Sequence, residues 1–195
     1  MTLYGMAYVV VSGLARVVWR LRVVGRENVP RTGPLIVASN HVSNFDPPLV
    51  GVALTRPISY MAKKELFAVP LLGPLIARLN AYPVDRQAGG TAALRASLRM
   101  LKEGRCIGVF PEGGRNVHGD KEAKAGAAFL AAASGAPVVP AAIVGSRELR
   151  PFKRVTVAFG APMHLARNRQ SEGDDLEKGA AEIMQRIRTL EESNR

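Results

Sequence analysis

A histidine and an aspartate with four residues between them stand on one short polar stretch, Asn40-His41-Val42-Ser43-Asn44-Phe45-Asp46. A tight loop brings two side chains at this spacing into hydrogen-bond contact. A carboxylate that holds one imidazole nitrogen leaves the other nitrogen free to act as a general base. His41 and Asp46 are therefore candidate catalytic residues. A structural interpretation is compatible with this one, because Asp46 followed by Pro47 is also typical of a helix N-cap.

No residue near this pair has the surroundings of a covalent nucleophile. Ser43 is close to His41 in the sequence, but it lacks the strained, glycine-flanked turn that presents a nucleophilic serine. The single cysteine, Cys106, precedes the apolar run 107–110 and is predicted to be a buried strand residue. We therefore expect the base to activate a substrate hydroxyl group directly.

Two further polar clusters, 85–86 and 112–115, directly follow predicted strands. Each cluster contains an arginine, and a guanidinium group binds phosphate bidentately. Arg86 and Arg115 are therefore candidate phosphate ligands. Taken singly, an arginine in a loop is more often a solvated surface residue, so the prediction depends on the repeated position at strand ends.

The second of these clusters also contains residues suited to a close ligand contact. Gly113 and Gly114 allow the backbone to approach a ligand and offer N–H groups to an anion, although paired glycines are more often a simple turn. Glu112 is expected either to fix an arginine or to accept a hydrogen bond from a substrate hydroxyl group.

The elements that must position these residues alternate along the chain. Apolar runs bounded by turn residues predict strands at 21–24, 34–38, 58–62, 81–84, 106–110, 137–144 and 155–159. Helices are predicted at 91–102, 126–134 and 174–190, with further helical stretches opening at Leu49 and Lys63. This order predicts an α/β fold with a mixed, largely parallel sheet flanked by helices. Parallel strands end at one edge, so the polar clusters are expected to converge.

Three single residues carry local structural predictions. Thr91 is a candidate N-cap, and Gly135 is a candidate terminator of the preceding helix. Pro83 lies within a predicted strand and indicates an edge strand or a bend, because proline cannot donate to the ladder.

The composition indicates one globular domain with an anionic partner. The chain has 195 residues, 47% hydrophobic and 22% charged, with a formal net charge of +11. Most of this excess lies in residues 1–120, which also hold the candidate chemistry. The partner is expected to be a phosphate-bearing substrate, an anionic lipid surface or nucleic acid. Aromatic residues make up only 6% and are not interleaved with basic ones, so nucleic acid is disfavoured.

The amino terminus has the pattern of an interfacial helix. Residues 1–15 carry no charge, and Arg16, Trp19, Arg20 and Arg22 follow them. This run is shorter than the roughly 20 apolar residues that cross a bilayer, but it suits a membrane interface. The alternative is a helix packed on the core of its own domain. We therefore divide the chain into a membrane-associating helix, residues 1–22, and an α/β domain, residues 23–195.

Four blocks in order resemble the glycerolipid acyltransferases, and specifically the 1-acyl-sn-glycerol-3-phosphate (PlsC-like) acyltransferases. The blocks are Asn-His-x-Ser-x-x-Asp at 40–46, Val-Asp-Arg at 84–86, Phe-Pro-Glu-Gly at 110–113 with Arg115, and Val-Pro-Ala at 139–141. The resemblance runs from about Val24 to Pro162.

The resemblance implies a reaction between two substrates without a bound cofactor or metal. His41 would be the base that deprotonates the acceptor hydroxyl group, and Asp46 would orient it. The alkoxide would then attack the thioester carbonyl of acyl-CoA or acyl carrier protein, which are co-substrates.

The resemblance also assigns the acceptor side of the site. Pro140 would be a structural or acyl-side residue. Gly114 stands where the family usually has Thr or Ser, which removes a hydroxyl donor near the phosphate. The acceptor-phosphate site would comprise Arg86, Glu112, Gly113 and Arg115, with Gly114 beside them.

The leading hypothesis is an O-acyltransferase that acylates lysophosphatidic acid to phosphatidic acid in phospholipid biosynthesis. It would be a peripheral or monotopic protein on an anionic membrane, at the cytoplasmic face of the cell membrane. A second hypothesis keeps the reaction but changes the acceptor to glycerol-3-phosphate, another lysophospholipid or a lipid without phosphate. A third is a non-catalytic basic protein that binds anionic membrane or nucleic acid. A metal hydrolase is disfavoured, because His118 and His164 are not at metal-ligand spacing.

Overall fold

The computed structural model describes residues 3–84, 90–166 and 173–195. Within these residues, seven strands form one sheet in the order β1-β7-β6-β2-β5-β3-β4. Neighbouring strands are parallel except for the antiparallel pair β6–β7, which confirms the predicted mixed, largely parallel sheet. The strands are β1 (Arg22–Val24), β2 (Leu35–Ser39), β3 (Ile58–Lys63), β4 (Ala81–Val84), β5 (Cys106–Val109), β6 (Val138–Val144) and β7 (Thr156–Phe159).

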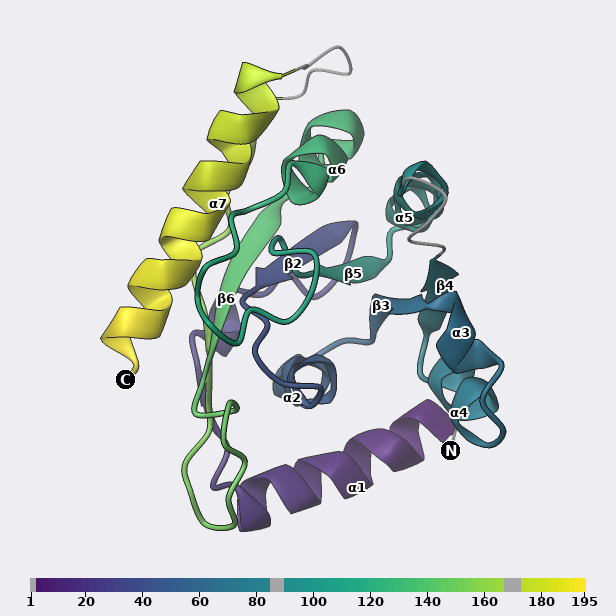
Figure 1. Cartoon of the computed structure of the whole chain (residues 1–195), viewed down its shortest axis with the longest axis vertical. Helices are drawn as coiled ribbons and strands as arrows, with labels where there is room; N and C mark the ends of the chain where they lie inside the picture. The colour runs from purple at the N-terminus through teal and green to yellow at the C-terminus, as the bar shows by residue number, and fades with distance from the viewer. Residues whose placement is uncertain (1–2, 85–89, 167–172) are drawn as a thin grey trace.

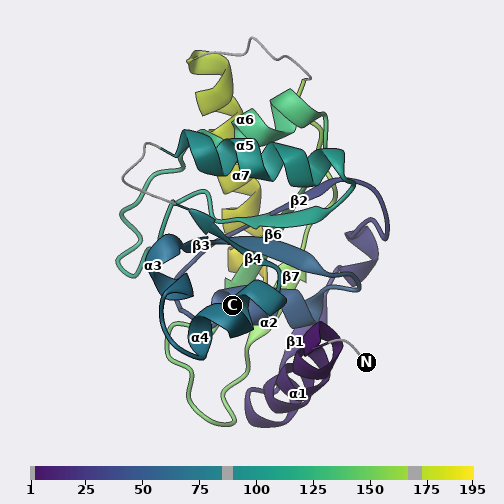
Figure 2. The ribbon, with the colours of Figure 1, turned by 90° about the vertical axis from the view of Figure 1, so that its right-hand side faces the viewer.

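Helices cover both faces of the sheet (Figures 1 and 2). α5, α6 and α7 pack on one face, α1 and α2 pack on the other, and the short helices α3 and α4 lie beside the β3–β4 edge. The helices are α1 (Leu3–Val18), the 3-10 helix η1 (Arg26–Asn28), α2 (Asp46–Ala53), α3 (Lys64–Phe67), α4 (Leu72–Arg78), α5 (Thr91–Lys102), α6 (Gly126–Ser134) and α7 (Asp174–Ser193).

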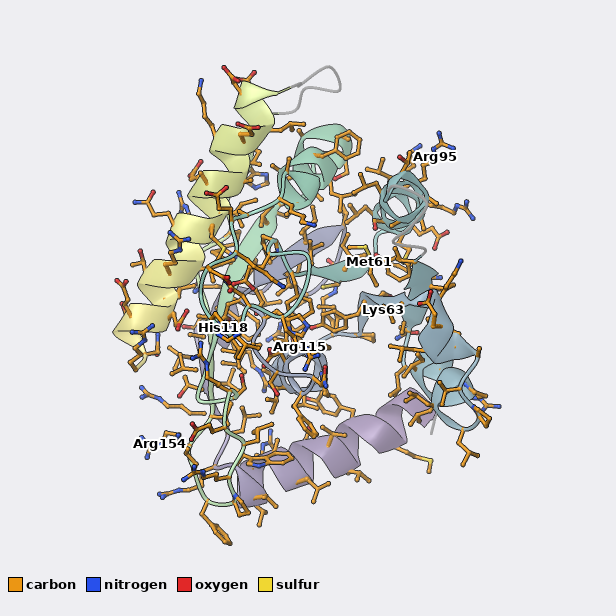
Figure 3. The ribbon with its side chains drawn as sticks, in the orientation of Figure 1. Met61, Lys63, Arg95, Arg115, His118 and Arg154 are labelled. Atoms are coloured by element: carbon orange, nitrogen blue, oxygen red, sulfur yellow. The ribbon has the colours of Figure 1, made fainter. Side chains whose placement is uncertain are left out.

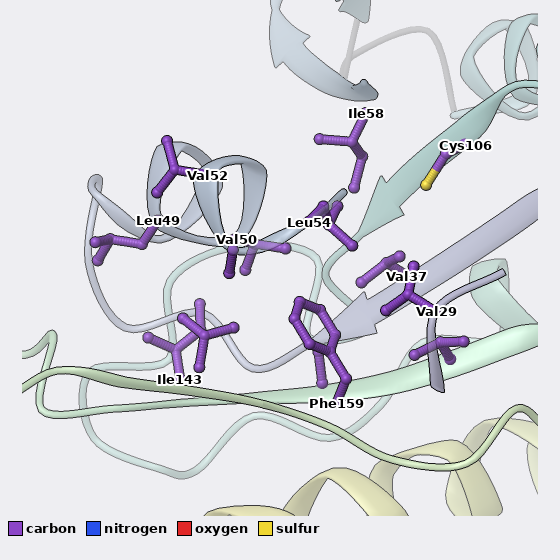
Figure 4. Packing of buried hydrophobic residues seen from close by; sticks show 14 of the residues in the cluster. Val29, Val37, Leu49, Val50, Val52, Leu54, Ile58, Cys106, Ile143 and Phe159 are labelled. Atoms are coloured by element: carbon purple, nitrogen blue, oxygen red, sulfur yellow. The ribbon is translucent and has the colours of Figure 1, made fainter. Parts of the chain in front are cut away.

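The central strand β2 shows why its apolar run is buried on both faces. Successive side chains of a strand point to opposite faces. Leu35 and Val37 join the core under α1 and α2, a cluster shown in Figure 4, whereas Ile36 and Ala38 join the core under α5, α6 and α7. Two hydrophobic cores therefore hold β2 in place, and with it the loop that begins at Asn40.

Two of the local predictions at single residues were confirmed. Gly135 ends α6 with φ 72°, and its N–H donates to the Ala131 carbonyl at 2.8 Å. Pro83 lies exposed on β4, which is an edge strand. The prediction that Thr91 caps α5 was wrong, because Gly90 takes the N-cap position with φ 73°. The Gly90 carbonyl accepts the Leu94 N–H at 3.1 Å, and no side chain caps the start of the helix.

The amino-terminal helix α1 combines features of both interpretations of residues 1–22. Its inner face packs on the core beneath α2, with Ala15 fully buried and Tyr8 and Val11 partly buried. Its outer face is apolar and exposed, through Met6, Val9, Val10, Leu14 and Val17. None of the helices in the described ranges is both long enough and apolar enough to cross a bilayer.

Candidate active site

The carboxyl ends of three parallel strands bring the candidate residues together. β2 leads into the loop of His41 and Asp46, β5 leads into the loop of Glu112, and β3 ends at Lys63. β2 and β3 both pair in parallel with β5, so these three ends share one edge of the sheet. The predicted convergence is confirmed for the first two loops, whereas Asp85-Arg86 lies outside the described residues.

The predicted contact between His41 and Asp46 is present. The Nδ1 atom of His41 lies 2.9 Å from Oδ2 of Asp46. An ionised carboxylate only accepts hydrogen bonds, so Nδ1 carries the proton that is donated. In the neutral ring, Nε2 is then unprotonated and can act as a base.

Asp46 is held rigidly at the start of α2. It is fully buried, and its Oδ2 atom also accepts the backbone N–H groups of Val42 and Ser43, each at 2.7 Å. Phe45 occupies the N-cap position of α2, and no side chain caps this helix. The N-cap interpretation of Asp46 was therefore wrong: its carboxylate turns back to the preceding loop instead. The positive end of the helix macrodipole still favours a negative charge at this position.

The imidazole ring of His41 is also fixed by aromatic stacking. Phe110 stacks on His41 with ring centroids 4.1 Å apart and planes inclined by 21°. Tyr60 stacks on Phe110 in turn, with ring centroids 5.8 Å apart and planes inclined by 12°. Sequence reasoning gave Phe110 and Tyr60 no role. The available signal for Phe110 was an aromatic residue at the very end of a predicted strand, next to a polar cluster.

Glu112 connects the two catalytic loops. Its Oε2 atom accepts the backbone N–H of His41 at 2.8 Å, and its Oε1 atom accepts the Asn116 side-chain amide at 3.0 Å. The Asn116 N–H donates in turn to the His41 carbonyl at 2.6 Å. Burial raises the pKa of the Glu112 carboxyl group. Both oxygens of Glu112 are thus used within the protein, and its contact with a substrate stays a prediction.

Asn40 anchors the other end of the His41 loop to the sheet. This buried side chain donates to the Ile143 carbonyl at 3.0 Å and accepts the Ile143 N–H at 2.7 Å. The amide thus imitates a strand neighbour of β6 just beyond the end of β2. Asn40 and Asn116 were both missed as positioning residues, because their partners lie far away in the sequence or across a loop.

The loop after β5 carries several cations. Gly113 has φ 69°, and a Cβ atom there would lie 2.9 Å from the side chain of Lys124. Gly114 is half-buried, and Arg115 is exposed, with its carbonyl accepting the Lys121 ammonium at 2.7 Å. Figure 3 marks Arg115 on this loop and Lys63 at the end of β3.

An apolar cavity of about 370 Å³ lies beside the His41 loop. Asn44 and Pro47 line it from the His41 loop and α2, and Tyr60 lines it from β3. Its volume falls in the range of ligand sites, roughly 300–1,000 Å³. Pro140 lies elsewhere, in a separate hollow with Arg186 of α7.

This arrangement favours direct attack by a substrate hydroxyl group. The Ser43 hydroxyl oxygen accepts the Phe45 N–H at 3.3 Å, so it serves the turn. Cys106 lies buried at the amino end of β5, away from the catalytic edge, and burial raises its pKa to about 12. A base beside an apolar cavity and several cations suits an amphiphilic, anionic alcohol.

Comparisons with known proteins agree with this chemistry. A family model described as Acyltransferase matches residues 20–144. The 1-acyl-sn-glycerol-3-phosphate acyltransferase of Bacillus subtilis (strain 168) is 35% identical over 150 residues, which cover 75% of each chain. The protein of the same name from Streptococcus pneumoniae (strain ATCC BAA-255 / R6) is 28% identical over 166 residues, 82% of this chain and 61% of that protein.

A solved structure shares the fold as well as the sequence pattern. The crystal structure of the 1-acyl-sn-glycerophosphate (LPA) acyltransferase PlsC from Thermotoga maritima matches with a TM-score of 0.74 and 28% identity, over 98% of this chain and 78% of that chain. The family match contains His41, Asp46 and Glu112 and spans well over half of the sequence. The chain belongs to the acyltransferase family, and it is an acyltransferase.

Proposed function

We propose that this acyltransferase moves a fatty acyl group from a thioester to the free hydroxyl group of lysophosphatidic acid and so forms phosphatidic acid. The observation that carries this proposal is the His41–Asp46 pair on a loop whose residue Asn44 lines an apolar cavity, with cations on the neighbouring loops. The names of the Bacillus subtilis and Thermotoga maritima proteins, which specify this acceptor, support the choice.

In this reaction the imidazole moves one proton. The Nε2 atom of His41 takes the proton of the acceptor hydroxyl group while its oxygen attacks the thioester carbonyl carbon. The new ester C–O bond forms, the C–S bond breaks, and the departing thiolate receives the proton from the imidazolium. The buried Asp46 carboxylate stabilises the positive charge on the ring between the two steps.

The cations at the sheet edge that carries the His41 loop would bind the acceptor phosphate. Arg115 follows β5, and Lys63 ends β3, a strand that pairs directly with β5. Arg86 remains a candidate on sequence grounds alone. Gly113 and Gly114 let the backbone come close to the phosphate, and they offer no hydroxyl group to it. The acyl chains of the substrates would occupy the apolar cavity.

The donor thioester is acyl-CoA or acyl carrier protein, with no bound cofactor. The enzyme would work as a peripheral or monotopic protein at the cytoplasmic face of the membrane. The exposed apolar face of α1 would lie in the interface, and Arg16 and Arg20 would contact anionic headgroups.

An acceptor screen tests this function. The purified protein is given one long-chain acyl-CoA and, separately, lysophosphatidic acid, glycerol-3-phosphate, lysophosphatidylcholine or monoacylglycerol. Release of free thiol and the mass of the lipid product are measured. Lysophosphatidic acid should give the highest kcat/KM, and Arg115→Ala should lower it more for this acceptor than for monoacylglycerol. A preference for glycerol-3-phosphate or monoacylglycerol would overturn the proposed acceptor.

A further inference from the structure

A second apolar surface lies away from α1, on the helical hairpin formed by α3 and α4. The twelve residues 66–77 contain no charged and no polar side chain. Several of them are exposed to solvent: Leu66, Val69, Leu71, Leu72 and Leu75. We refer to residues 66–77 as the hairpin. Contiguous exposed apolar surface of this kind marks an interaction site.

The tip of the hairpin is built to hold a leucine outward. Leu71 has φ 66° and ψ −44°, a conformation that a leucine rarely adopts, and its side chain is 89% exposed. The turn is closed by the Leu72 N–H donating to the Pro70 carbonyl at 2.8 Å and the Gly73 N–H donating to the Val69 carbonyl at 2.9 Å. A Cβ atom at Gly73 would overlap the Phe67 carbonyl, so the two helices pack closely. Strain and exposure thus coincide at one residue.

The inner side of the hairpin borders the apolar cavity. Leu66 and Ile76 line one wall of the apolar cavity, and Tyr8 and Val11 of α1 line another. Figures 1 and 2 both place α4 and α1 on the same side of the molecule. The hairpin and α1 therefore flank the same cavity, where the acyl chains of a lipid substrate would be held.

Charge at the ends of the hairpin favours an anionic lipid surface over a neutral partner. Lys63 and Lys64 precede it and Arg78 follows it, with Glu65 as the one acidic neighbour. An apolar segment between basic residues inserts its apolar side chains and leaves the cations among the phosphates. At the amino terminus, arginines likewise follow an uncharged run, residues 1–15.

We propose that the hairpin is a second membrane-inserting element, with Leu71 placed among the lipid acyl chains of an anionic bilayer. Together with α1 it directs the cavity between them toward the bilayer. The inference rests on the proposed function to the extent that the substrate is a lipid. The insertion itself is measured without turnover, so the two can fail separately.

Fluorescence quenching measures the position of the tip. Leu71→Trp is made in a Trp19→Phe background, which removes the single native tryptophan. Ala181→Trp in the same background is the control, because Ala181 is exposed on α7 at the far side of the sheet. Both proteins are mixed with phosphatidylcholine–phosphatidylglycerol vesicles that carry bromine on the acyl chains. The Leu71→Trp emission should shift to the blue and be quenched, whereas the Ala181→Trp emission should do neither.

A second variant separates binding from folding. Leu71 is 89% exposed and buries little apolar surface in the folded protein, so Leu71→Asn should leave the melting temperature within about 1–2 °C. It should also lower vesicle partitioning by about tenfold, the order expected from losing the burial of one leucine side chain. Ala181→Asn should change neither. Activity on a dispersed short-chain acceptor should be unchanged in Leu71→Asn.

Three results would overturn the proposal. One is a Leu71→Trp emission that stays unquenched while the protein sediments with the vesicles. Another is a blue shift without vesicles that grows with protein concentration, which would assign the hairpin to contact with a second copy of the chain. A third is unchanged partitioning of Leu71→Asn. Quenching in a protein that transfers no acyl group to any acceptor would contradict only the proposed function.

Discussion

The carboxylate of Glu112 accepts the backbone N–H of His41 at 2.8 Å and thereby joins two loops that are 71 residues apart in the sequence. The same carboxylate is buried, and burial raises its pKa above the ordinary value for glutamate. Glu112 is therefore a positioning residue whose charge is held at a cost to stability.

The pH dependence of stability should reveal this cost. A carboxyl group with a raised folded-state pKa favours the folded protein most when it is protonated in both states. That contribution is complete below the unfolded pKa and is lost as pH rises through the folded pKa. Relative to Glu112→Gln, the wild type should therefore gain unfolding free energy as pH falls from 7 to 4. Urea unfolding of both proteins at several pH values measures the difference, and a constant difference would rule out the buried charge.

Substitutions at Asp46 can separate two roles of its carboxylate, which are to orient the His41 ring and to supply a negative charge. All three of its side-chain hydrogen bonds are made by Oδ2, whereas Oδ1 is buried with no hydrogen-bond partner among the described residues. In Asp46→Asn the amide oxygen can keep the three bonds, but the negative charge is gone. Turnover should fall by about 10²–10⁴, as for loss of an effective base. The far-UV circular dichroism should stay unchanged.

Asp46→Ala is the matched comparison for that prediction. It removes the acceptor as well as the charge, which leaves the N–H groups of Val42 and Ser43 and the ring of His41 without their partner. Its melting temperature should lie clearly below that of Asp46→Asn. Equal melting temperatures, or near-normal turnover in Asp46→Asn, would contradict the assigned role.

Gly108 controls the aromatic stack behind the catalytic histidine. A Cβ atom at this position would overlap the ring of Tyr60, which stacks on Phe110, which in turn stacks on His41. Gly108→Ala should displace Tyr60, destabilise the protein by about 1–3 kcal/mol and lower turnover. Thermal unfolding and steady-state kinetics measure both effects.

Two further variants check that the overlap is the cause. At Gly51 in α2 a Cβ atom would make only an ordinary contact with Ile58, at 3.8 Å, so Gly51→Ala should be neutral or stabilising. The pair Gly108→Ala/Tyr60→Leu should be more stable than the sum of its single changes. Strict additivity of the two changes would show that the ring is not what Gly108 accommodates.

The sequence allowed the fold to be predicted because each strand is a short apolar run between turn residues. The runs before His41 and before Pro111 end at the same edge, so the approximate place of the site followed from the topology. The role of Glu112 did not follow, because its partner His41 is distant in the chain. The N-cap interpretation of Asp46 failed for a local reason: two backbone N–H groups of the preceding loop compete for its carboxylate.

The outer face of α1 should bind membrane without supporting the fold. Val17 is 72% exposed, whereas Ala15 on the inner face is fully buried. Because the inner face belongs to the core, deletion of the whole helix would confuse unfolding with release from the membrane. Val17→Asp should instead lower partitioning onto anionic vesicles and leave the melting temperature within about 1–2 °C. The exposed Thr189→Asp on α7 is the control of equal charge. Partitioning that falls equally in both variants would assign the effect to net charge alone.

The central claim is that His41 is the base that activates the acceptor hydroxyl group, and product analysis of His41→Ala tests it most directly. Wild type and variant are given lysophosphatidic acid and a long-chain acyl-CoA, and phosphatidic acid is quantified by mass spectrometry beside free thiol. The wild type should form one phosphatidic acid per thiol released. The folded His41→Ala protein should form it about 10²–10⁴ times more slowly. Turnover within a few-fold of wild type, or a covalent acyl-enzyme trapped in either protein, would contradict the mechanism.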